Sequence, residues 1–179
     1  ETRENFAWEI QEQFGGTPRT GLNTSGQELQ TIGEASSEFG TTMTTGDFNA
    51  DGKVDLAVGA PAYSSDTGRV YIFYSDGSLA TGANNADVVI AGGAISKFGG
   101  RVFAGDINAD GKTDLIASNP FGTSGGSIYI FYNDGSYPST ATTADVIITG
   151  EAYKPFGRGM TMGDFNADGK IDLVASAPL

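Results

Sequence analysis

The sequence contains no histidine and no cysteine, and only 10 of its 179 residues are lysine or arginine. Without histidine and cysteine the chain cannot form a Ser-His-Asp or Cys-His nucleophile, an ordinary zinc site or a disulfide. Its 22 acidic residues give a net charge of −12, which would repel the phosphates of nucleic acids. No run of 18 apolar residues occurs, so no membrane-spanning segment is predicted. The excess of carboxylates favours a hard cation, calcium first, as the natural ligand.

An internal repeat dominates the rest of the sequence. Three stretches align without gaps: GDFNADGKVDLAVGAP at 46–61, GDINADGKTDLIASNP at 105–120 and GDFNADGKIDLVASAP at 163–178. Their first aspartates are separated by 59 and then by 58 residues. A Phe-Gly pair stands eight residues before each of these aspartates, at 39–40, 98–99 and 156–157. The chain is therefore built from copies of one structural unit.

The segments between the repeats have the composition of β-strands. Residues 70–74 match 128–132, residues 87–90 match 145–148, and all four segments are β-branched or aromatic and bounded by turn formers. Strands are also predicted directly before the repeated loop, at 41–45, 101–104 and 159–162, and directly after it, at 56–58, 115–117 and 173–175. No segment shows helical periodicity over 11 residues. Each unit thus contains four strands, and the alternating aromatics of 70–74 and 128–132 are expected to be buried between units.

The N-terminal residues carry no such loop but fit the second half of a unit. Residues 29–33 stand before their Phe-Gly pair as 88–92 and 146–150 do, which predicts a fourth strand. A third strand is predicted at 6–10, with 11–14 as the alternative, and a Gly-, Pro- and Thr-rich hairpin at 15–26. The predicted domains are 1–38 (strands three and four of a preceding or closing unit), 39–97, 98–155 and 156–179 (strands one and two).

The repeated loop has the pattern D-x-N-x-D-G-x-x-D. Side-chain oxygens at positions 1, 3, 5 and 9, with a backbone carbonyl at position 7, can wrap a cation that prefers six to eight oxygen ligands. Glycine at position 6 permits the sharp turn. The predicted ligands of three Ca²⁺ ions are Asp47, Asn49, Asp51, the Lys53 carbonyl and Asp55; Asp106, Asn108, Asp110, the Lys112 carbonyl and Asp114; and Asp164, Asn166, Asp168, the Lys170 carbonyl and Asp172.

Two other interpretations of this loop are less favoured. An EF-hand requires a bidentate glutamate at position 12, where this chain has Val58, Ala117 and Ala175. A plain turn would explain the Asp, Asn and Gly content, but not three copies with identical candidate ligands. We expect the three carboxylates of a loop to lie within a few ångströms of one another, where mutual repulsion favours a bound cation.

The Phe-Gly pair, the calcium-type loop and the following Gly-Ala-Pro at 59–61 together resemble the FG-GAP repeat of integrin α-subunits and related extracellular propellers. The resemblance covers residues 29–179, although 118–120 and 176–178 read Ser-Asn-Pro and Ser-Ala-Pro. It implies an all-β fold, a β-propeller of four-stranded antiparallel blades, with half a blade, two full blades and another half blade in this chain. It further implies calcium in the loop between strands one and two of each blade, secretion or cell-surface display, and a role in adhesion or ligand recognition.

Several alternatives remain open. The leading hypothesis is a non-enzymatic module that binds a protein or a glycan on a cell surface; the others are an accessory domain or fragment of a larger secreted enzyme, and a lectin. Because three blades cannot close a ring of ordinary radius, we expect a partner at the open edges. That partner is either a second copy, which would complete a six-bladed ring, or further blades of a longer chain.

Overall fold

The computed structural model describes residues 21–22, 28–29, 34, 36–76, 82–94, 96–122 and 125–178. Its strands are β1 (Gly21–Leu22), β2 (Glu28–Leu29), β3 (Thr42–Gly46), β4 (Asp55–Ala60), β5 (Arg69–Phe73), β6 (Val88–Ala91), β7 (Arg101–Gly105), β8 (Asp114–Ser118), β9 (Ser127–Phe131), β10 (Val146–Thr149), β11 (Met160–Gly163) and β12 (Asp172–Ala175). Three short helical turns are α1 (Tyr63–Asp66), η1 (Ala83–Asn85) and η2 (Ala141–Thr143). Within the described part of the chain, no helix is long and apolar enough to cross a membrane.

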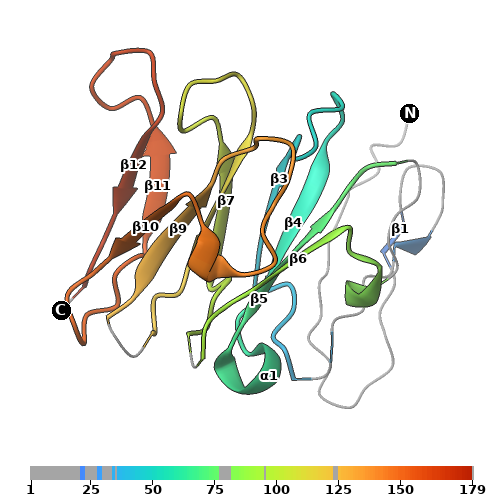
Figure 1. Cartoon of the computed structure of the whole chain (residues 1–179), viewed down its shortest axis with the longest axis horizontal. Helices are drawn as coiled ribbons and strands as arrows, with labels where there is room; N and C mark the ends of the chain where they lie inside the picture. Colours follow the sequence, from blue (N-terminus) through green and yellow to red (C-terminus); the bar gives the residue numbers. More distant parts are fainter. Residues whose placement is uncertain are drawn as a thin grey trace, which may run out of the picture.

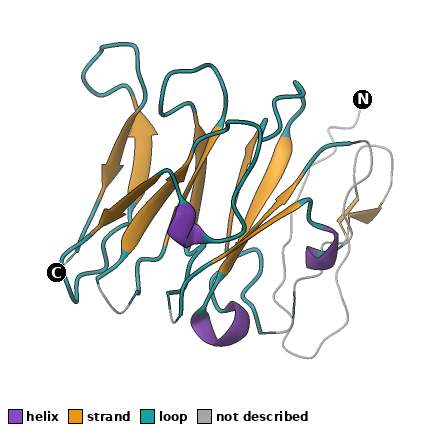
Figure 2. Cartoon of the chain, in the orientation of Figure 1, coloured by secondary structure: helices purple, strands orange, loops and turns teal. Residues whose placement is uncertain are grey.

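The strands form consecutive antiparallel meanders. β3 to β6 make one four-stranded sheet and β7 to β10 a second, in each of which neighbours in sequence are neighbours in the sheet. β11 pairs with β12 in a two-stranded sheet, and β1 pairs with β2. The sheets stand side by side like blades, with the C-terminal β11–β12 sheet at one end of the row (Figure 1, Figure 2). This arrangement confirms the prediction of an all-β propeller built from four-stranded antiparallel blades.

The observed strands lie within one or two residues of the predicted ones, except in the N-terminal region. There the predicted strand at 6–10 lies outside the described residues, and of the predicted strand at 29–33 only Leu29, in β2, is described. β2 pairs in register with β1, with Leu29 opposite Gly21.

The connection between β4 and β5 contains a turn that the sequence did not predict. The short turn α1 is built from residues with left-handed backbone, with φ of 47° at Ser64, 55° at Ser65 and 66° at Asp66. Among residues other than glycine, asparagine and aspartate tolerate this region best, so the two serines incur strain there. The turn is closed by the Thr67 hydroxyl, which donates to the Ser64 carbonyl oxygen.

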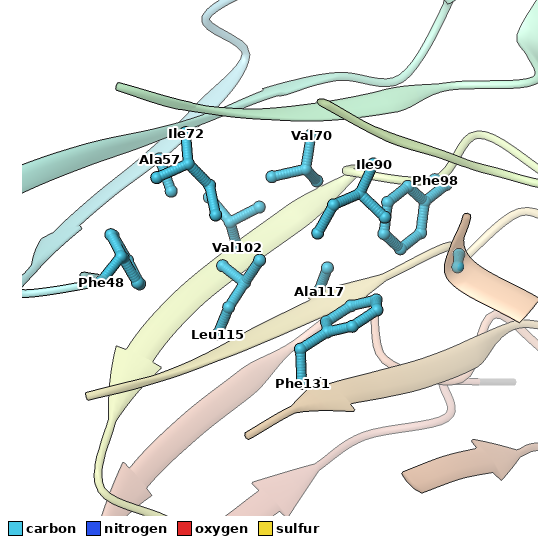
Figure 3. Close-up of a cluster of buried hydrophobic side chains, with 11 residues drawn as sticks. Phe48, Ala57, Val70, Ile72, Ile90, Phe98, Val102, Leu115, Ala117 and Phe131 are labelled. Carbon is cyan, nitrogen blue, oxygen red and sulfur yellow. The ribbon is translucent and has the colours of Figure 1, made fainter. Parts of the chain in front are cut away.

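The hydrophobic core lies between adjacent sheets. One cluster joins the first and second sheets through the residues drawn in Figure 3, among them Phe48, Ile72, Phe98, Leu115 and Phe131. A second cluster joins the second sheet to β11 and β12. Successive side chains alternate between the two faces of a strand, so the first and second sheets each contribute to clusters on both their faces.

The aromatic strand segments behave as predicted. Tyr71, Phe73 and Phe131 are buried, and the partly buried Tyr129 packs on Phe98 edge to face with ring centroids 5.2 Å apart. Phe131 and Tyr129 therefore lie between the first and second sheets, whereas Tyr71 and Phe73 are buried in a cluster formed by residues of the first sheet and its connections.

The Phe-Gly pairs mark the start of each sheet's first strand. Phe98 is fully buried, and the following Gly99 has a left-handed φ of 84°. The Gly99 N–H donates to the Ser118 carbonyl oxygen at the end of β8, while Phe98 forms a parallel bridge with Gly68 of the preceding sheet. The pair thus starts one blade and joins it to the one before.

Candidate metal centre

The three repeated loops lie at the same edge of the row of sheets. They connect β3 to β4, β7 to β8 and β11 to β12, and all three project in one direction (Figure 1). The sequence repeat thus becomes a spatial repeat, in which each predicted cation site stands on its own pair of strands.

Each loop contains two residues with left-handed backbone. In the first loop these are Ala50, with φ of 57°, and Gly52, with φ of 82°. The same positions in the other loops have φ of 61° and 85° at Ala109 and Gly111, and of 61° and 83° at Ala167 and Gly169. Only glycine adopts this region freely, which explains its place at position 6. The alanine at position 4 is held there by the hydrogen bonds of its loop.

The first aspartate of each loop accepts two backbone hydrogen bonds. Asp47 Oδ1 accepts from the Asp51 N–H at 3.0 Å, and its Oδ2 accepts from the Gly52 N–H at 2.8 Å. The same two bonds, between 2.8 and 3.1 Å, recur at Asp106 and Asp164. This side chain therefore fixes the turn, and the second lone pair of each oxygen remains able to bind a cation.

The polar residues at positions 3 and 5 also bond within the loop. Asp51 Oδ1 accepts from the Lys53 N–H at 2.9 Å, and its Oδ2 accepts from the Lys53 ammonium at 3.1 Å. These hydrogen bonds lower the pKa of Asp51, the backbone bond from Lys53 contributing most. In the second loop the Asn108 side-chain amide donates to Asp110 Oδ2 at 3.2 Å instead, and the third loop repeats that contact.

The lysine at position 7 also uses its side chain in the first loop, which the loop pattern did not indicate. The exposed Lys53 ammonium pairs with the Asp51 carboxylate, 3.1 Å apart. An exposed pair of this kind contributes little to stability.

The aspartate at position 9 is the most enclosed candidate ligand. Asp55 is 2% exposed and Asp114 is 0% exposed. Asp114 Oδ2 accepts from the Ile107 N–H at 3.0 Å and Oδ1 from the Asn133 N–H at 2.9 Å. Burial raises the pKa of Asp114, and the two backbone donors oppose that rise. A buried carboxylate of this kind gains from any additional positive charge.

Asp55 repeats this arrangement in the first sheet. Its Oδ2 accepts from the Phe48 N–H and its Oδ1 from the Ser75 N–H, both at 2.8 Å. Ser75 and Asn133 follow the matching aromatic strands β5 and β9, and sequence reasoning missed both. The sequence could have indicated them, because they occupy matching positions directly after 70–74 and 128–132.

The donor set of each loop fits a hard cation, although the carboxylates do not converge as expected. Among the described residues no three carboxylates come together as a group that could enclose an ion. Instead, backbone N–H groups, the Lys53 ammonium and the Asn108 amide occupy one side of these oxygens. All candidate side-chain ligands are oxygen donors on a short loop, the chemistry that Ca²⁺ prefers. The fifteen predicted ligands remain a prediction.

Comparisons with known proteins identify the repeat. The FG-GAP repeat model matches residues 39–73, and the FG-GAP-like repeat model matches residues 106–175. Together these two matches include all three loops.

Two kinds of relative share this region. Mouse phosphatidylinositol-glycan-specific phospholipase D is 30% identical over an alignment of 180 positions, which covers 92% of this chain and 22% of that protein. Integrin alpha-PS5 of Drosophila melanogaster is 30% identical over 78% of this chain and 14% of that protein. Rat integrin alpha-7 is 31% identical over 74% of this chain and 12% of that protein. The chain thus spans less than a quarter of the length of each of these relatives.

The matched repeats coincide with the meander sheets and with the loops at their common edge. The chain therefore belongs to the FG-GAP repeat family, as an integrin-like β-propeller domain.

Proposed function

We propose that this chain is a calcium-stabilised, extracellular recognition module without catalytic activity of its own. The observation that carries the proposal is the threefold repetition of one oxygen-rich loop, with the same internal hydrogen bonds, at one edge of the sheets. Extracellular calcium is abundant enough to fill even weak sites, which supports a location outside the cell.

Each loop would bind one Ca²⁺ through its side chains at positions 1, 3, 5 and 9 and the carbonyl at position 7. The ion would balance the three aspartates of its loop and tie the turn to the start of the following strand. At a free calcium concentration of 100 times the dissociation constant, one site adds about 2.7 kcal/mol to the free energy of unfolding. Calcium would thus stabilise and rigidify the fold rather than take part in catalysis.

Thermal unfolding tests this assignment. We expect millimolar calcium to raise the melting temperature relative to chelator, and Asp110→Ala to remove part of that rise. Asp134→Ala is the matched control, since Asp134 is an exposed aspartate outside the loops that caps Ser136. An equal calcium response in wild type and Asp110→Ala would refute a site in the second loop.

The proposed recognition role requires a binding partner in addition to calcium. A propeller held rigid by its loops can present the connections at its edges to a protein or glycan on a cell surface. A pull-down from cell-surface extracts in calcium tests for a protein ligand, and a glycan array tests for a lectin. Absence of binding in both assays would count against recognition without affecting the calcium assignment.

The likeness to phosphatidylinositol-glycan-specific phospholipase D favours a second candidate, an accessory part of a larger secreted enzyme. That likeness covers 92% of this chain but only 22% of the phospholipase. In this case also we expect no hydrolysis of a glycosylphosphatidylinositol substrate by this chain alone. Release of the lipid by the purified chain would contradict both candidates.

We further propose that the face of β11 and β12 turned away from the second sheet accepts another blade. Phe165 is 60% exposed and Val174 is 50% exposed there. The occupant is either a second copy, in a calcium-dependent dimer that closes a six-bladed ring, or further blades of a longer chain. Light-scattering mass in calcium decides: twice 18.5 kDa supports the dimer, and a monomer supports a longer chain.

A further inference from the structure

The segment that follows β9 in the second sheet contacts the first loop of the preceding sheet. The Asn133 side-chain amide donates from Nδ2 to the backbone carbonyl oxygen of Asp47 at 3.2 Å. Four residues further on, the Tyr137 ring packs edge to face on Phe48, with ring centroids 6.4 Å apart. Two neighbouring residues of the first loop are therefore positioned by the next blade.

The backbone of Asn133 also holds the second loop. Its N–H donates to Oδ1 of Asp114, the aspartate at position 9. Asn133 and Asp114 are both 0% exposed. One buried residue thus joins the first aspartate of one loop to the last aspartate of the next, 67 positions away in the sequence.

The side-chain amide of Asn133 is buried. Its Oδ1 is buried without a hydrogen-bond partner in the described part of the chain, so Nδ2 makes the one hydrogen bond that the structure shows for this side chain. A buried polar atom without a partner is costly. Burying an asparagine whose oxygen has no partner brings no stability by itself. The contact of Nδ2 with Asp47 is therefore the feature that explains the position of this side chain.

Movement of the Asp47 backbone changes the first loop directly. The Asp47 carboxylate accepts from the Asp51 and Gly52 N–H groups, so its position sets the shape of the turn. A shift of Asp114 on binding a cation would be transmitted through the backbone of Asn133 to its side chain and on to Asp47. The matching residue of the first sheet, Ser75, has a side chain too short to span the same distance.

We propose that Asn133 is a positioning residue that couples calcium binding in the first and second loops, so that an ion in one raises the affinity of the other. This inference rests on the proposed function, in which the loops bind calcium. Because coupling between two sites is reciprocal, each ion changes the affinity of the other loop by the same factor. We expect a factor of about five, at the lower end of the usual range.

Three glycine amides report on the loops separately. Gly52, Gly111 and Gly169 each donate to the first aspartate of their own loop at 2.8 to 2.9 Å. A calcium titration of the ¹⁵N-labelled chain, followed at these three resonances, gives one dissociation constant for each loop.

The test compares the effect of loop substitutions in the chain that has Asn133 and in the Asn133→Ser variant. With Asn133 present, Asp110→Ala should weaken calcium binding at Gly52 about fivefold, and Asp51→Ala should weaken it at Gly111 by the same factor. In Asn133→Ser, which keeps the N–H for Asp114 and copies Ser75, Asp110→Ala should leave the constant at Gly52 unchanged. Gly169 is the internal control and should not respond to any of these substitutions.

The possible failures are distinct. Calcium shifts with independent constants in wild type would overturn the coupling and leave the proposed function intact. Coupling that persists in Asn133→Ser would overturn the role of Asn133. Absence of calcium shifts at all three glycines would overturn both the inference and the proposed function. If Asn133→Ser fails to fold, the reciprocity measured with Asp110→Ala and Asp51→Ala still decides whether the loops are coupled.

Discussion

The two four-stranded sheets and the β11–β12 sheet carry the same loop pattern but enclose its last aspartate differently. Asp55 and Asp114 are buried, and each accepts a second backbone hydrogen bond from a residue that follows the third strand of its sheet. Asp172 is partly exposed, and the structure shows one backbone hydrogen bond to its side chain, from the Phe165 N–H within the loop. The turn is therefore a property of nine local residues, whereas the environment of position 9 comes from the third strand.

The same comparison holds for the apolar residues around the loop. Phe48 is 1% exposed between the first and second sheets, but its counterpart Phe165 is 60% exposed. Ile116 in β8 is 0% exposed, but Val174 in β12 is 50% exposed. The same motif is thus buried only where a neighbouring blade packs against it. Substitutions at matched positions should therefore lower the free energy of unfolding by different amounts.

The largest difference is expected between Phe48→Ala and Phe165→Ala. Loss of the buried Phe48 ring should lower the free energy of unfolding by about 3–5 kcal/mol. Loss of the exposed Phe165 ring should lower it by about 0.5 kcal/mol or less. Urea unfolding followed by far-ultraviolet circular dichroism measures both. Equal losses would mean that Phe165 is covered in solution, which would support the proposal that another blade docks there.

A smaller difference is expected between Asp114→Ala and Asp172→Ala, measured in chelator so that metal binding does not contribute. Asp114→Ala leaves the Ile107 and Asn133 N–H groups without their acceptor in a buried place. At roughly 1–2 kcal/mol for each donor, the loss is about 2–4 kcal/mol. Asp172→Ala frees one N–H that water can reach, so it should cost about 1 kcal/mol or less. A reversed order would show that the third-strand contact does not stabilise position 9.

Much of the fold was predictable because the repeat specifies it. The spacing of 59 and 58 residues, the strand composition and the Phe-Gly pairs defined the strands of the two full sheets. The loop positions were equally clear, since D-x-N-x-D-G-x-x-D directly specifies the turn and its internal hydrogen bonds. These features depend on residues close together in the sequence.

The features that sequence reasoning missed depend on contacts between distant residues. The bond from Asn133 to Asp47 joins residues in neighbouring sheets, and nothing in either local sequence indicates it. The left-handed turn at Ser64 to Asp66 lies in a connection that has no matching sequence in the second unit, so the repeat offered no guide. The carboxylates were expected to converge, but the backbone amides of the loop provide them with other partners.

The departures from Gly-Ala-Pro gain a physical explanation at the junctions between blades. A Cβ atom on Gly59 would lie 2.1 Å from the Gly99 carbonyl oxygen, so the first junction requires glycine. At the matching position of the second sheet, the buried Ser118 hydroxyl donates to the Gly157 carbonyl oxygen at 2.9 Å. The first junction thus brings two backbones into contact, whereas the second inserts a side chain between them.

The smallest expected effects sharpen this contrast between blades. Gly59→Ala forces a backbone shift at the junction and should lower the free energy of unfolding by about 1–3 kcal/mol. Ser118→Ala removes one buried hydrogen bond and should cost about 1 kcal/mol. Both are measured by urea unfolding, with Gly93→Ala as a control, since a Cβ atom there meets no other atom within 4 Å. If Gly59→Ala is tolerated as well as Gly93→Ala, the two junctions are equally adaptable, and the glycine of the first repeat is not required by packing.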